Sequence, residues 1–90
     1  MKETDLAKSV IAWLQDLKWE VYQEVQVFSY GPIADIVATF GAITWVVETK
    51  ISFSLKVMSQ AEQWTPFSNL VSVAVPTGRF KDGAFKERIL

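Results

Sequence analysis

The residues best suited to chemistry in this 90-residue chain are two carboxylates and a lysine near its middle, Asp35, Glu48 and Lys50. The chain contains neither cysteine nor histidine. This absence excludes thiolate chemistry, Ser-His-Asp and Cys-His triads, and zinc sites of the usual kind. Any catalysis or metal binding must therefore come from carboxylates, Lys, Arg, Tyr, Ser or Thr.

A predicted β-hairpin positions these residues. Two runs with strand character, 34–40 and 43–51, are separated by Gly41-Ala42. Glycine at the first of two loop residues is typical of a type II′ turn, which pairs Phe40 with Ile43.

Counting outward from this turn predicts that Asp35 lies directly opposite Glu48, with Lys50 on the same face. Like charges at opposed positions destabilise a sheet, and a divalent cation between the carboxylates would relieve the repulsion. Two alternatives stay open. In the first, the two carboxylates are solvated strand ends, and a register slip of one residue would place them on opposite faces. In the second, Lys50 forms only a surface ion pair with one of the carboxylates.

The remaining pattern predicts the elements that surround the hairpin. Apolar residues at helical spacing indicate an amphipathic helix within 3–18, and alternation indicates a strand over 20–28. A second helix runs from a cap at Ser54 to Trp64, and a short buried strand covers 70–75. The basic segment from Phe80 is predicted to be helical. The third and fourth strands should be parallel, which gives an α/β (α+β) fold with a mixed sheet flanked by helices.

The acidic pair is part of a longer motif. Glu48-Thr49-Lys50 follows Asp35 as Glu-x-Lys, thirteen positions later, across a hairpin and within the order helix, three strands, helix, strand. In these respects the chain resembles the PD-(D/E)xK nuclease superfamily, which has a three-layer restriction-endonuclease-like αβββαβ core. The resemblance covers residues 3–76, and it implies one minimal nuclease-like domain over residues 1–90.

A second motif points to the same family. Residues 60–64 read Gln-Ala-Glu-Gln-Trp, similar to the Q-x-x-x-Y motif of RecB-type and VRR-type members, with Trp in place of Tyr. A glutamate in the first helix, here Glu3, is shared with many members, Holliday-junction resolvases among them. The chain departs from the family at Ala34, where members carry the proline of the motif.

The resemblance implies metal-dependent hydrolysis of phosphodiester bonds in DNA. Branched or flapped DNA is a candidate substrate, and RNA stays open as an alternative. Asp35, Glu48 and the backbone carbonyl of Thr49 would hold Mg²⁺ or Mn²⁺, with Glu3 as a candidate further ligand. Lys50 would orient the attacking water and stabilise developing charge. Gln60 would complete a catalytic set with Asp35, Glu48 and Lys50.

Charge distribution suggests where nucleic acid would bind. The formal net charge is −1, so no global basic field recruits DNA, but residues 46–90 hold six basic and four acidic groups. Lys56 falls in the first turn of the second helix, where a phosphate would bind, and Arg79 and Lys81 are further candidates for DNA contact. Cutting both strands requires two active sites, which favours a homodimer.

Two other functions remain as alternatives. One is a catalytically inactive nuclease-fold module that binds nucleic acid or a protein partner, and the other is a small α/β interaction module whose acidic pair is incidental. No apolar run is long enough for a membrane helix, and the polar N-terminus lacks the apolar core of a signal peptide. We therefore expect a cytoplasmic protein without membrane contact.

Overall fold

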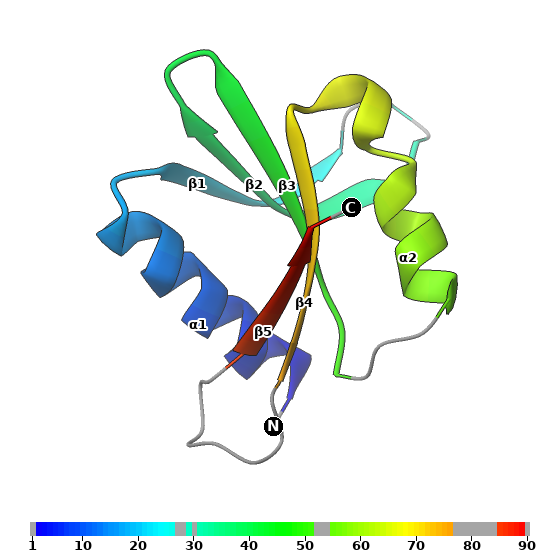
Figure 1. The fold of residues 1–90 in the computed structure, drawn as a ribbon, viewed down its shortest axis with the longest axis horizontal. Helices are drawn as coiled ribbons and strands as arrows, with labels where there is room; N and C mark the ends of the chain where they lie inside the picture. Colours follow the sequence, from blue (N-terminus) through cyan, green and yellow to red (C-terminus); the bar gives the residue numbers. More distant parts are fainter. Residues whose placement is uncertain (1, 27–28, 30, 52–54, 77–84, 90) are drawn as a thin grey trace.

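The computed structural model describes residues 2–26, 29, 31–51, 55–76 and 85–89. Helix α1 and three strands come first, then helix α2, a 3₁₀ turn and two further strands (Figure 1). The bounds are α1 (Glu3–Asp16), β1 (Glu20–Gln26), β2 (Ile33–Phe40), β3 (Ile43–Thr49), α2 (Leu55–Glu62), η1 (Thr65–Phe67), β4 (Leu70–Pro76) and β5 (Phe85–Ile89). This order confirms the predicted α+β fold.

The strands form one mixed sheet in the order β1-β2-β3-β4-β5. Its only parallel pair among the described strands is β3 with β4, joined through α2 as predicted. The β2–β3 hairpin has the predicted register, with Phe40 opposite Ile43. Gly41 adopts a φ of 59°, the sign that a type II′ turn requires at its first central residue.

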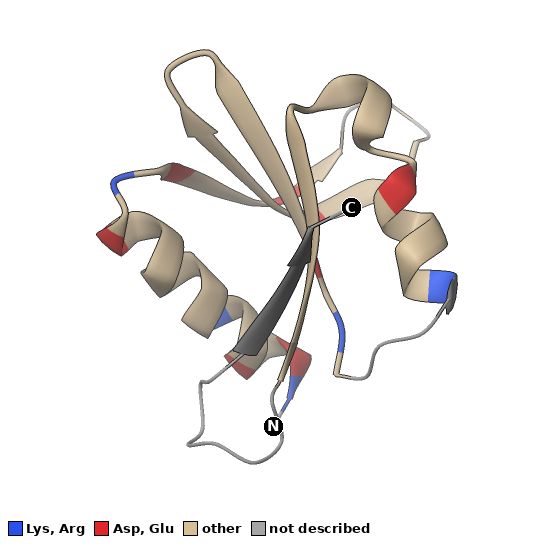
Figure 2. Cartoon of the chain, in the orientation of Figure 1, with Lys and Arg blue, Asp and Glu red and all other residues tan. Residues whose placement is uncertain are grey.

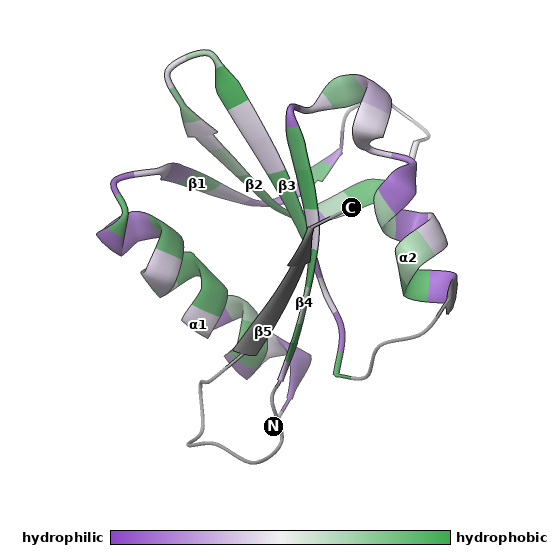
Figure 3. Cartoon of the chain, viewed as in Figure 1, coloured by the Kyte–Doolittle hydropathy of each residue, from purple (hydrophilic) through white to green (hydrophobic). Residues whose placement is uncertain are grey.

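Each face of the sheet is covered by one helix, so the domain has three layers (Figure 1). Leu6, Val10 and Leu14 recur every fourth residue along α1 and are fully buried against one face. Val57 and Ala61 of α2 pack against the other face together with Trp64. Figure 3 shows that hydrophobic positions dominate the central strands between these helices.

Strand β3 is buried on both faces because it lies at the centre of this arrangement. Its side chains alternate between the two apolar clusters, with Trp45 and Val47 on the α1 side and Val46 on the α2 side. Trp45 also contacts the rings of Trp13 and Trp19 edge-on, at centroid distances of 5.6 and 5.3 Å. The hairpin therefore places Glu48 and Thr49 at the end of a buried strand.

The prediction of a helix at the C-terminus is wrong for the part of the segment that the structure describes. Residues Phe85–Ile89 form β5, which pairs antiparallel with β4, while residues 80–84 lie outside the described part. The physical reason is that β4 offers an open edge of backbone donors and acceptors. Five residues gain more from that edge than from an isolated helical turn.

None of the described helices has the length and hydropathy needed to cross a membrane.

Candidate functional site

The site begins with the register of the hairpin. Ile36 of β2 pairs with Val47 of β3, and the paired register of the two strands ends there, so the predicted pairing of Asp35 directly opposite Glu48 is not part of it. Glu48 is only 6% exposed, whereas Asp35 is half-buried at the border of a cavity. The two acidic side chains are nonetheless in contact, because Glu48 shares a hydrogen bond with Asp35.

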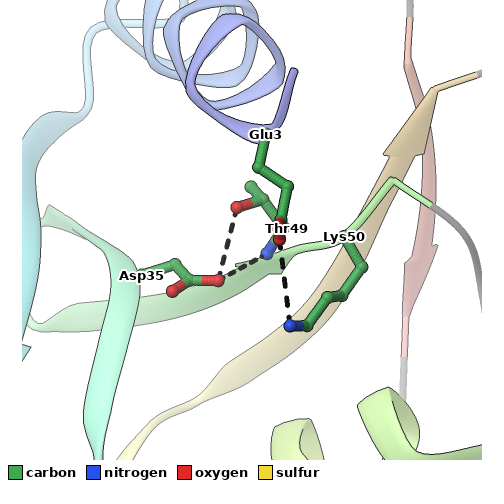
Figure 4. A network of polar contacts seen from close by, with 4 residues as sticks. All are labelled: Glu3, Asp35, Thr49 and Lys50. Carbon is green, nitrogen blue, oxygen red and sulfur yellow. Dashed lines mark hydrogen bonds and ion pairs between the residues drawn. The ribbon is translucent and has the colours of Figure 1, made fainter. Parts of the chain in front are cut away.

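Asp35 is held by the residue that follows Glu48. Its Oδ2 accepts a hydrogen bond from the backbone N–H of Thr49 at 2.8 Å and a second from the Thr49 hydroxyl at 3.3 Å (Figure 4). Thr49 is 4% exposed, so both donors are nearly shielded from water. The structure therefore gives Thr49 a role in holding Asp35, while metal binding by its backbone carbonyl stays a prediction.

Glu48 is held from the opposite side of the sheet. The indole Nε1–H of Trp64 donates a hydrogen bond of 2.5 Å to its Oε1. Trp64 is 1% exposed and belongs to the core. The sequence motif 60–64 gave no sign of this bond, because it depends on how α2 packs across the sheet.

The environment of Glu48 changes its affinity for a proton. Burial, followed by the hydrogen bond and the negative charge of Asp35, raises the pKa of Glu48 from 4.5 to about 8, and the hydrogen bond from Trp64 opposes the rise. At neutral pH the pair therefore retains a proton. A shared proton relieves the like-charge conflict, and a bound divalent cation would relieve it in the same way.

Lys50 lies just beyond the end of β3 and extends toward the start of α1. Its Nζ is 3.8 Å from Oε1 of Glu3, and both side chains are partly exposed (Figure 4). Figure 2 shows acidic and basic positions side by side in this part of the fold, while the central strands carry few charges. The fold thus brings four predicted residues together at one end of the central strands: Glu3, Asp35, Thr49 and Lys50.

A cavity of about 420 Å³ opens at this end of the strands, on the side of the sheet that α1 covers. Glu3 and Lys8 of α1 line it together with Asp35, Thr49 and Glu24 of β1. Glu24 is not among the residues that the sequence predicted for the site. The pairing of Gln23 with Ile36 and of Val25 with Ala34 places it beside Asp35, and this β1–β2 register is the signal that would have located it.

The other predicted residues lie apart from this cavity or outside the described chain. Lys56 is exposed in the first turn of α2, and Gln60 is half-buried one turn before Trp64. Arg79 and Lys81 lie outside the described residues. No set of three or more Asp or Glu side chains in the described ranges is grouped closely enough to hold a metal ion.

The chain matches no protein-family model, no curated protein and no solved structure.

Proposed function

We propose that this protein is a nuclease of the PD-(D/E)xK type, which uses Mg²⁺ or Mn²⁺ to hydrolyse phosphodiester bonds in DNA. The observation that carries the proposal is the contact between Asp35 and Glu48. Placing two carboxyl groups in contact within a buried site costs free energy, and groups with strongly perturbed pKa values cluster at functional sites. The order of elements and the position of Lys50 agree with this assignment.

The donor set suits a hard divalent cation. Asp35 and Glu48 offer carboxylate oxygens, and Mg²⁺ commonly binds one or two carboxylates and completes its shell with water and phosphate oxygens. Such an ion, when bound, polarises the scissile phosphate and lowers the pKa of a bound water. The backbone carbonyl of Thr49 and the carboxylate of Glu3 are the further ligands that we propose.

We propose that Lys50 contacts the attacking water and the scissile phosphate. Its ammonium is partly exposed beyond the end of the central strand β3, where it can reach an incoming phosphate or water. The long contact with Glu3 is weak enough to be exchanged for substrate. Gln60 is a candidate support on α2. Lys56, with Arg79 and Lys81, is proposed to contact DNA, and two copies of the chain would serve the two strands.

A second candidate function is nucleic-acid or protein binding without catalysis. The raised pKa of Glu48 favours it, because a protonated carboxyl is a poor cation ligand at neutral pH. On this alternative a bound proton, and not a metal ion, relieves the electrostatic repulsion between Asp35 and Glu48.

A cleavage assay separates these functions. Single-stranded, duplex, flapped and four-way DNA are incubated with Mg²⁺ or Mn²⁺ and with the wild type, Asp35→Asn or Lys50→Ala. We expect cleavage by the wild type and its loss in both variants. Glu62→Gln, which removes an exposed carboxylate of α2, is the matched control and should cleave like the wild type. DNA binding without cleavage under every condition would instead support the second function.

A further inference from the structure

Trp64 connects the carboxylate pair to the core on the α2 side of the sheet. It lies two residues beyond the end of α2, is 1% exposed and packs with Val57 and Ala61. Its indole has a single hydrogen-bond donor, and that donor is used on Oε1 of Glu48. The ring thus fills space like any core residue, but its N–H fixes one oxygen of a buried carboxyl group.

A second buried indole shows that filling the core does not require such a contact. Trp45 is 8% exposed, and its Nε1–H donates at 2.8 Å to the hydroxyl of Ser72. Packing and satisfaction of the indole are therefore available from a neutral acceptor. The bond from Trp64 to Glu48 is a separate property of the site.

Both carboxylates are held by a hydrogen bond to one of their two oxygens. Thr49 holds Oδ2 of Asp35, and Trp64 holds Oε1 of Glu48, so each group has one oxygen bonded to a donor that is nearly inaccessible to water. A carboxylate fixed in this way loses little rotational freedom when it binds a ligand. Donors behind the ligating groups commonly set the affinity of metal sites.

We propose that Trp64 is a positioning residue of this site, whose indole N–H fixes the Glu48 carboxylate for binding a divalent cation together with Asp35. This inference rests on the proposed function, because it requires that the pair binds such a cation. It assigns Trp64 no contact with substrate. The prediction is that loss of the N–H weakens cation binding even when the ring is replaced by another aromatic ring.

Calorimetric titration with Mn²⁺ tests the proposal on the full chain. Trp64→Phe keeps an aromatic ring and removes the donor, and it should weaken Mn²⁺ binding about 10- to 100-fold. Trp45→Phe removes the other buried indole donor and should bind within about twofold of the wild type, because its partner is Ser72. Equal affinity of Trp64→Phe and the wild type would overturn the inference and leave the proposed function standing.

A spectroscopic measurement keeps the test independent of whether Trp64→Phe folds. The four tryptophans give four indole N–H resonances in a ¹H–¹⁵N NMR spectrum. We expect Mg²⁺ to shift the Trp64 resonance of the wild type, and expect no such shift in Glu48→Gln. A Trp64 resonance that stays fixed while the wild type binds Mg²⁺ would contradict the inference alone. A wild type that binds neither cation would overturn the inference and the proposed metal site together.

Discussion

Asp35 and Glu48 occupy neighbouring positions on β2 and β3, yet the two sides of the sheet give them different surroundings. Asp35 borders the open cavity beside α1 and accepts two hydrogen bonds from Thr49. Glu48 is buried and accepts one hydrogen bond from Trp64. This burial is the largest cause of the raised pKa of Glu48.

This difference shows how the layers of a fold give two equal groups different surroundings. Burial disfavours the charged form of a carboxyl group, so the desolvated Glu48 holds a proton more tightly than a free glutamate does. The surroundings differ because α1 leaves a cavity at the end of the sheet, whereas Trp64 closes the opposite side.

The largest effect is the dependence of stability on pH that Glu48 should cause. The unfolded chain releases this proton near pH 4.5, but the folded chain holds it to about pH 8. As the pH rises through this window, the unfolded state is the first to gain from ionisation, so the free energy of unfolding falls. The contribution of Glu48 to stability is therefore fully present below about pH 4.5 and lost by about pH 8.

Thermal unfolding followed by circular dichroism at about pH 5 and about pH 8.5 measures this loss. The midpoint should fall more steeply with pH in the wild type than in Glu48→Gln, which cannot ionise. Glu62→Gln should keep the slope of the wild type, because Glu62 is exposed on α2. If Glu48→Gln and the wild type have the same slope, Glu48 does not retain its proton in the folded state.

A smaller effect should follow from neutralising the other carboxylate. Asp35→Asn removes the negative charge beside Glu48, which contributes to the raised pKa, but leaves its burial, the largest cause, in place. The pKa of Glu48 should therefore fall and remain above 4.5. A ¹³C NMR titration of the side-chain carboxyl carbons measures it. An unchanged pKa would show that burial alone sets the proton affinity of Glu48.

Much of the frame around this site could be predicted from local sequence. Gly41 and the flanking strand residues set the hairpin register, and the four-residue spacing of Leu6, Val10 and Leu14 identified the buried face of α1. These signals are local because a turn and a helical period involve residues that are close along the chain. They place Asp35 and Glu48 one position beyond the last pair of the hairpin, Ile36 with Val47.

The surroundings of the carboxylates depend on contacts between distant segments. The bond from Trp64 to Glu48 requires α2 to cross the sheet, and Glu24 reaches the cavity only through the pairing of β1 with β2. β5 forms because β4 has an edge to pair with, which the composition of the last segment did not reveal. Tertiary pairing, rather than propensity, decides these features.

The smallest effect tests the hold of Thr49 on Asp35. Thr49→Val keeps the branched shape and the backbone N–H but removes the hydroxyl that donates to Oδ2. Loss of one hydrogen bond from a site shielded from water should lower the free energy of unfolding by about 1 kcal/mol, measured by urea denaturation. Thr49→Ser restores a hydroxyl and should recover part of the loss.

Thr39→Val on the half-buried part of β2 is the control and should change stability by less than about 0.5 kcal/mol. If Thr49→Val is as stable as the wild type, the backbone N–H alone holds Asp35, and the two carboxylates are then each fixed by one donor.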